Sequence, residues 1–279
     1  MAEISAGLVK ELREMTGLGM MECKKALTEA GGDLKKAEEL LRIKSGAKAS
    51  KAAGRIAAEG VIGVWLSADS KVGALVELNC ETDFVAKNED FLGFAQALAQ
   101  IVATRSPANV EELSSLDLLG NKVEAKRQAL VQKIGENITL RRFRRLRAKG
   151  RLAQYLHGTG KIGVLVDYEG PEDLGKGLTM HLAFYRPQYL AKADVPADVL
   201  GREREIQAAR AKESGKPAEI AAKMVEGALN KYLAEITLLG QPYVLNDKMT
   251  VERTLASTKG KVHDYAVLVV GEGIVKTVH

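Results

Sequence analysis

Residues 5–45 carry apolar side chains at the three- and four-residue spacing of amphipathic helices. Ser5 can cap a first helix, and the glycines of residues 16–19 suit a tight turn after it. A second helix fits residues 20–30, and Asp33 can cap a third. The pattern therefore predicts a three-helix module at the N-terminus.

The pattern changes twice after this module. Residues 44–55 are rich in Ala, Lys, Gly and Ser and lack large apolar side chains, which predicts a linker with partial helical character. From residue 60 onward, β-rich runs and amphipathic helices follow one another. The expected strands are residues 61–66, 72–80, 137–146, 152–156, 161–168 and 264–270, and the expected helices are residues 89–103, 122–134 and 251–256. This mixture predicts an α+β core.

A short sequence echo lies within the core. Gly60-Val-Ile-Gly-Val and Gly160-Lys-Ile-Gly-Val each precede a strand and a helix. Two related strand–helix subdomains would explain this echo, although five residues make a weak repeat.

A helical hairpin is expected towards the C-terminal side of the core. Residues 198–214 are strongly charged and helical in pattern, and residues 215–217 supply a turn. Pro217 is well placed to start a second helix, whose apolar side chains repeat on one face. Two such helices, back to back, would offer an apolar stripe to a partner.

These patterns divide the chain into five segments, and the predicted fold class is α+β. The segments are a three-helix N-terminal domain with its linker (1–54), the N-subdomain of the core (55–140), the first part of the C-subdomain (141–195), the helical hairpin (196–235) and the completion of the C-subdomain (236–279).

Composition restricts the class of protein. Of the 279 residues, 46% are hydrophobic and 28% are charged, which is typical of a globular chain. No apolar run approaches the roughly 18 residues of a membrane span. The N-terminus contains acidic residues and no apolar segment with a cleavage site, so no secretory signal is expected. Two cysteines in different predicted domains fit a reducing compartment rather than a disulfide framework, and a cytoplasmic location is expected.

Two glycine-rich stretches resemble nucleotide-binding motifs. Residues 158–163 have the spacing of a dinucleotide fingerprint, but they precede a strand rather than a helix, which favours a hairpin turn. Residues 170–177 fit GxxxxGK, but Gly177 stands where Ser or Thr would bind magnesium, and Glu172 and Asp173 would repel phosphate. The histidines show no metal-ligand spacing. The sequence therefore argues for no enzymatic activity, cofactor or metal.

A basic segment stands out in residues 137–166, which contain no acidic side chain. Its arginines concentrate in residues 141–151, and Phe143 lies among them, which allows an RNA-binding interpretation. An edge strand guarded by charge and a face complementary to an acidic protein are the alternatives.

Residues 82–88 form the most unusual stretch, because they lead from an apolar strand into a helix. Thr82 or Asp83 can cap this helix, and Phe84 lies just inside it. From these residues alone, a cap with a hydrophobic staple and a functional role both remain open.

Five motifs, in order along nearly the whole chain, resemble bacterial elongation factor Ts. They are VKELREMTGLGMMECKKAL from residue 9, TDFVAKN from residue 82, KIGEN from residue 133, GKPAEIAAKMVEG from residue 215 and GQPYV from residue 240. The resemblance implies a ubiquitin-associated-like N-terminal domain, a two-subdomain α+β core and a coiled-coil hairpin. It also implies a non-enzymatic guanine-nucleotide exchange factor for the GTPase elongation factor Tu.

The same resemblance assigns site residues. Thr82, Asp83, Phe84 and Val85 correspond to the segment that disturbs the magnesium site of the GTPase, with Phe84 as the apolar wedge. The implied partner-binding residues are Arg13, Met20, Met21, Lys24, Ile134, Gly135, His157, Val244 and Leu245. Adjacent methionines after a glycine turn cannot both face a small core, so at least one is expected to be exposed.

The expected partner is elongation factor Tu, both GDP-bound and nucleotide-free. A homodimer or a 2:2 complex through the core or the helical hairpin is possible. No membrane or nucleic-acid partner is expected, and the RNA-binding interpretation of residues 141–151 is kept as the alternative.

Overall fold

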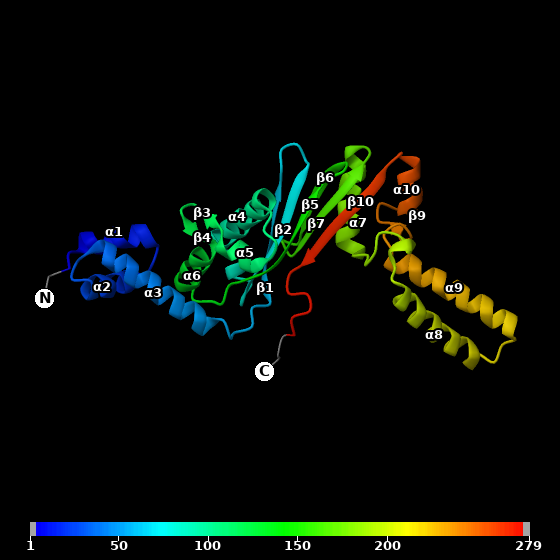
Figure 1. Cartoon of the computed structure of the whole chain (residues 1–279), viewed down its shortest axis with the longest axis horizontal. Coiled ribbons are helices and arrows are strands. Elements are labelled where there is room, and N and C mark those ends of the chain that lie inside the picture. Colours follow the sequence, from blue (N-terminus) through cyan, green and yellow to red (C-terminus); the bar gives the residue numbers. More distant parts are fainter. Residues whose placement is uncertain (1–3, 276–279) are drawn as a thin grey trace.

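The computed structural model describes residues 4–275 and shows an elongated molecule (Figure 1). Three N-terminal helices form one end, two small sheets with their helices form the middle, and a helical hairpin protrudes at the other end. The predicted α+β class is confirmed. The boundaries of the five predicted segments remain predictions.

The N-terminal module consists of α1 (Ala6–Thr16), α2 (Met20–Glu29) and α3 (Leu34–Ala52). The predicted caps are confirmed, because the Ser5 hydroxyl accepts the Leu8 N–H and the Asp33 carboxylate accepts the Lys36 N–H. The buried side chains of the module are Val9, Leu12, Leu18, Cys23, Ala26, Leu27, Ala37 and Leu41.

The stretch predicted as a linker with partial helical character, residues 44–55, is helical over most of its length, because α3 continues to Ala52. Alanine and lysine favour the helix. Ala49 and Ala52 are buried against the core, where α3 packs on α6 (Val123–Ile134). Small side chains therefore let a continuous helix join the module to the core.

The first sheet has the order β1-β2-β5 and is antiparallel throughout. Its strands are β1 (Glu59–Leu66), β2 (Val72–Cys80) and β5 (Thr139–Arg147), and its helices are α4 (Glu89–Arg105), α5 (Val110–Ser115) and α6. The predicted strands and the two longer helices are confirmed. The sequence pattern missed α5 and the hairpin of β3 (Asp117–Leu118) and β4 (Asn121–Lys122).

The second sheet has the order β10-β7-β6 and is also antiparallel. Its strands are β6 (Arg151–His157), β7 (Ile162–Glu169) and β10 (Lys261–Val269), and α7 (Glu172–Tyr185) packs on β6 and β7. A small hairpin of β8 (Pro242–Tyr243) and β9 (Asn246–Thr250) leads into α10 (Val251–Ser257).

The two sheets pack face to face, and the helices cover their outer faces. In β2, Ala74 and Val76 point towards the helices, whereas Leu75 points towards the other sheet. At Gly163 the sheets approach so closely that a Cβ atom would lie 2.4 Å from the Ile62 side chain. The buried cluster between the sheets consists of Ile62, Val64, Leu75, Leu146, Leu152, Leu165, Ala266 and Leu268.

The two sheets have the same order of strands along the chain, but Gly60 and Gly160 do not occupy equivalent positions in them. Gly60 lies in the edge strand β1, whereas Gly160 precedes the central strand β7. The equivalent central strand is β2, which is likewise followed by the helices of its sheet. The matching segments are therefore residues 71–84 and 161–174, which begin Lys-Val-Gly-Ala-Leu-Val-Glu and Lys-Ile-Gly-Val-Leu-Val-Asp.

The predicted helical hairpin is present as α8 (Ala197–Glu213) and α9 (Ala218–Ile236) (Figure 1). Pro217 directly precedes α9, as its fixed backbone angle favours. A short helical turn, η2 (Lys192–Asp194), comes before α8. Within residues 4–275, no helix is both long and apolar enough to cross a membrane.

Glu77 lies fully buried in β2 and explains part of the arginine-rich strand. Its carboxylate accepts hydrogen bonds from Arg141 Nη1 at 2.9 Å, Arg142 Nε at 2.5 Å and the Gly271 N–H at 2.8 Å. Arg142 also binds the Val269 carbonyl. Burial by itself would raise the pKa of Glu77, but the Gly271 N–H and the two guanidinium groups outweigh it and hold the pKa below its ordinary value. This carboxylate therefore connects the first sheet to the segment after β10.

Glu77→Gln should lower the free energy of unfolding at pH 7 by about 3 kcal/mol, because Arg141 loses its carboxylate partner and Arg142 keeps only Glu272. Since the folded pKa is lowered, the stabilisation is present above about pH 4.3 and is lost as pH falls through the folded value. Urea unfolding at pH 7 and pH 3 measures this. The gap between wild type and variant should narrow in acid, and an equal gap at both pH values would contradict the charge pairing.

Candidate functional site

Phe84, in the segment at the end of β2, has 80% of its surface accessible. It precedes a single helical turn, η1 (Val85–Lys87), and Lys87 Nζ lies 6.0 Å from the centre of its ring. The helix α4 begins later, and Asn88 caps it by accepting the Phe91 N–H at 3.2 Å. The cap predicted at Thr82 or Asp83 for this helix is therefore wrong, and the exposed Phe84 forms no hydrophobic staple.

Glu136 fixes the backbone that carries Phe84. Its Oε2 accepts the N–H groups of Glu81 and Thr82, each at 3.0 Å, and its Oε1 accepts the Thr82 hydroxyl at 2.6 Å. The Thr82 carbonyl accepts the Cys80 thiol at 3.1 Å. Burial raises the pKa of Cys80 to about 12, so the thiol stays protonated and can donate. We call these contacts, made by Cys80, Glu81, Thr82 and Glu136, the Glu136 clamp.

A reciprocal contact ties the clamp to the chain before β1. The Glu81 carboxylate accepts the Asn137 N–H at 2.5 Å and lies 3.2 Å from Arg55 Nε. Arg55 Nη2 donates to the Gly135 carbonyl at 2.9 Å, and the Arg55 carbonyl accepts from Asn137 Nδ2 at 2.7 Å. The end of β2, the loop after α6 and the chain after α3 are thus fixed together, and Ile134 and Gly135 lie at this junction.

The N-terminal site residues reach the same region. Arg13, Met20, Met21 and Lys24 are all exposed, so the prediction that at least one of the methionines is exposed is confirmed. The turn between α1 and α2 lies beside α6, because a Cβ atom on Gly17 would stand 3.3 Å from Lys133 Nζ. Lys133 in turn pairs with Asp90 at 2.6 Å, at the start of α4.

His157 lies at the same end of the core, as the last residue of β6 before the turn to β7. The turn is held there because the Gly160 carbonyl accepts the Ile62 N–H at 2.7 Å and Lys161 pairs with Glu59 at 2.9 Å. Glu59 is the register partner of Cys80, which leads into the Glu136 clamp.

Val244 and Leu245 lie apart from these residues, in the hairpin of β8 and β9 beside α7. Leu245 is exposed and Val244 is half-buried. The Val244 N–H donates to Nδ1 of the buried His181 at 3.1 Å, and the other ring nitrogen lies 2.9 Å from Gln241 Oε1. Since Nδ1 must accept, the proton is on Nε2 and the ring is neutral. Burial lowers the pKa of His181 in agreement with this assignment.

The residues that sequence reasoning missed are Arg55, Glu81, Glu136 and His181. Each acts on a residue more than fifty positions away, so neither periodicity nor local spacing could reveal it. Glu136 did stand inside the KIGEN motif, and this is the single signal the sequence offered.

The nucleotide-binding resemblances have structural explanations. Residues 158–161 form the turn between β6 and β7, and residues 162 and 163 begin β7, so the favoured interpretation of a hairpin turn is confirmed. Gly175 and Gly177 lie within α7, where a Cβ atom would stand 2.2 Å from the Tyr168 ring and 1.8 Å from the Tyr243 hydroxyl. These glycines therefore allow helix packing and form no phosphate loop.

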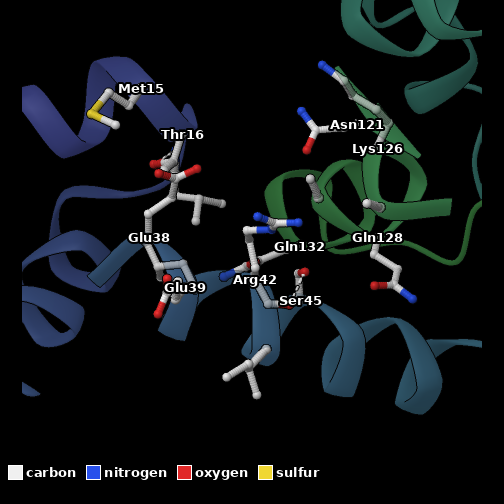
Figure 2. A pocket seen from close by; sticks show the side chains of 15 residues that line it. Met15, Thr16, Glu38, Glu39, Arg42, Ser45, Asn121, Lys126, Gln128 and Gln132 are labelled. Carbon is white, nitrogen blue, oxygen red and sulfur yellow. Dashed lines mark hydrogen bonds between the residues drawn. The ribbon is translucent and has the colours of Figure 1, made fainter. Parts of the chain in front are cut away.

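A cleft of about 690 Å³ lies between α3 and α6 (Figure 2). Its lining includes Glu38, Arg42, Lys126 and Gln128, and Figure 2 shows side chains from both helices around it. Among the described residues, no group of His, Cys, Asp and Glu could hold a metal ion. We interpret the cleft as the joint between the N-terminal module and the core.

Several arginines of β5 form hydrogen bonds or ion pairs within the molecule. Arg141 and Arg142 bind Glu77, and Arg145 donates to the Ala103 carbonyl at the end of α4. Arg144 and Arg147 are exposed but three positions apart in a strand, so they point to opposite faces. The exposed arginines of β5 therefore do not share one face of the strand, and β5 lies at the edge of its sheet.

The family model described as Elongation factor TS matches residues 81–272. The chain belongs to the elongation factor Ts family. Relatives named elongation factor Ts include proteins of Bordetella petrii (58% identical), Aromatoleum aromaticum (56%) and Chromobacterium violaceum (57%). The alignments cover 99%, 100% and 100% of this chain and 94%, 94% and 96% of those proteins, respectively. Membership identifies the chain as a translation elongation factor.

His181→Phe should lower the free energy of unfolding by about 1–3 kcal/mol, because the Val244 N–H and the Gln241 side chain lose a partner. In the wild type the lowered pKa makes this contribution present above about pH 6.5 and lost as pH falls towards the folded value. Urea unfolding from pH 7.5 to pH 5 measures the effect. The exposed His157→Phe serves as control, and an unchanged pH dependence in His181→Phe would exclude this linkage.

Proposed function

We propose that this protein is a guanine-nucleotide exchange factor that binds GDP-bound elongation factor Tu and promotes GDP release. It acts without chemical catalysis. The observation that carries the proposal is the exposure of Phe84 on a backbone held by the Glu136 clamp. A large exposed aromatic ring on a fixed backbone suits insertion into a partner.

Insertion of the Phe84 ring supplies binding energy at low cost. Transfer of a phenylalanine side chain from water into a protein interior contributes about 2–3 kcal/mol. Since the hydrogen bonds of Glu81 and Thr82 already fix the backbone, little ordering entropy is lost on binding. The structure thus offers a pre-organised apolar contact.

The exchange step follows from differential affinity. Magnesium and the nucleotide phosphates hold the switch regions of a GTPase, so a factor that binds the nucleotide-free state better must weaken that hold. We assign this role to Phe84, as a wedge near the magnesium site. A thousandfold faster release requires a barrier about 4 kcal/mol lower. Lys87, which hydrogen-bonds Asp83, lowers the pKa of that carboxylate, so Asp83 brings a negative charge beside the wedge.

We assign partner binding to the remaining exposed residues. Met20 and Met21 are 59% and 64% exposed, and adaptable thioether side chains suit a partner groove. Arg13 and Lys24 add positive charge on the same module. We assign further contacts to Ile134 and Gly135, which directly precede Glu136, to His157 at the end of β6, and to Val244 and Leu245 as a second region on the C-terminal half.

Phe84→Ala should slow the maximal rate of GDP release from elongation factor Tu by about tenfold or more, because the wedge is removed. Stopped-flow release of labelled GDP at saturating factor measures this rate. Leu119→Ala is the matched control, because Leu119 is 85% exposed in the turn between β3 and β4 and has no assigned role. Undiminished release by a folded Phe84→Ala protein would remove the ring from the mechanism.

Arg13→Ala and Met20→Ala should weaken complex formation more than they slow the catalysed step, because the N-terminal module holds the partner without entering the magnesium site. A titration of factor in the same release assay separates the two effects. The concentration for half-maximal rate should rise severalfold while the maximal rate stays near wild type. A fall in the maximal rate with unchanged half-saturation would contradict this division of roles.

A further inference from the structure

The two halves of the core differ in the burial of the apolar residue that follows their central strand. In the matching segments, Asp83-Phe84 corresponds to Asp173-Leu174. Leu174 lies in the first turn of α7, is 4% exposed and packs in the core, whereas Phe84 is 80% exposed. An apolar residue after the central strand therefore turns inward in one half and outward in the other.

The backbone before this position explains the difference. In the second half, Pro171 stands at the position of Glu81 and has no N–H, and α7 begins at the next residue. In the first half, the N–H groups of Glu81 and Thr82 both donate to Glu136, and α4 starts only at Glu89. The residues 82–88 are thus kept out of the helix.

We propose that Glu136 is a positioning residue for exchange, which keeps Phe84 pointing outward by holding Glu81 and Thr82. This inference rests on the proposed function, in which the Phe84 ring enters the partner. Glu136 binds the backbone before Phe84 and affects exchange only through the position of the Phe84 ring.

The donors around Glu136 bind most strongly to a charged carboxylate. Two backbone N–H groups and one hydroxyl converge on its two oxygens, and an ionised carboxylate accepts all three. A glutamine offers the two N–H groups a neutral amide oxygen, which is a weaker acceptor than a carboxylate oxygen, and its NH₂ group forces the Thr82 hydroxyl to turn from donor to acceptor. The Thr82 hydroxyl, while donating to Glu136, also accepts the Val85 N–H at 3.4 Å, which extends the clamp across Phe84.

The support of Glu136 is also fixed. Arg55 binds Gly135 and Asn137, and Glu81 binds Asn137. These hydrogen bonds hold the loop that carries Glu136, so the loop resists moving if the end of β2 is displaced. By contrast, the Asp83–Lys87 pair is exposed on both sides and contributes little to the geometry.

The test uses the full-length protein in a double-mutant cycle of Glu136→Gln with Phe84→Ala. Glu136→Gln alone should slow maximal GDP release from elongation factor Tu by about tenfold, as expected for a displaced group. In the Phe84→Ala background it should cause no further loss, because a residue that acts through the ring has no effect once the ring is gone. Glu111→Gln, an exposed carboxylate on α5, is the matched control.

A second readout is independent of the partner. Hydrogen exchange of the Glu81 and Thr82 amides in the free protein should become about tenfold faster in Glu136→Gln and stay unchanged in Glu111→Gln. If Glu136→Gln fails to fold, Thr82→Val replaces it in the same cycle, with Thr82→Ser as the variant that should restore wild-type release.

The outcomes separate the two proposals. Equal losses from Glu136→Gln with and without Phe84, or wild-type release by Glu136→Gln, would overturn the positioning role while leaving the exchange function intact. Unchanged release by Phe84→Ala would instead overturn the proposed function. In that case the amide exchange rates would still show whether Glu136 holds the segment.

Discussion

Face-to-face packing of the two sheets is the constraint on which the rest of the structure depends. Each sheet is buried on both faces, so the central strands β2 and β7 must be apolar on both. A polar side chain on these strands needs a full set of partners. Asp167 in β7 accepts the N–H groups of Lys149 and Gly150, and Glu77 in β2 is paired with Arg141 and Arg142.

The same constraint fixes the ends of the central strands, where the candidate site lies. Because β2 is held on all sides, its last residues leave the sheet in a defined direction. The Glu136 clamp then decides what the following residues do. Burial of apolar side chains fixes the two sheets, and the hydrogen bonds of Glu136 fix the backbone before the exposed Phe84 ring.

Much of the fold could be predicted from the sequence, because hydrophobic period reports local structure. The strands around Val72–Cys80 and the helix from Glu89 are examples. The α3 extension was predicted only in part, because small residues look like a linker until a partner helix is known. The two short hairpins carry too few residues for a period to show. The motifs located the segment of Phe84, but not the contacts of Glu136 or His181, which depend on residues that are distant along the chain.

The continuous helix α3 has a consequence for how a partner is met. It runs without a break from the N-terminal module to its packing site on α6. Met20 and Met21, at the start of α2, and Phe84, after the end of β2, are therefore held at a fixed distance from each other by the packing of α3 on α6. In the proposed complex, a partner bound at the methionines would therefore meet the Phe84 ring at high local concentration, which would favour the second contact.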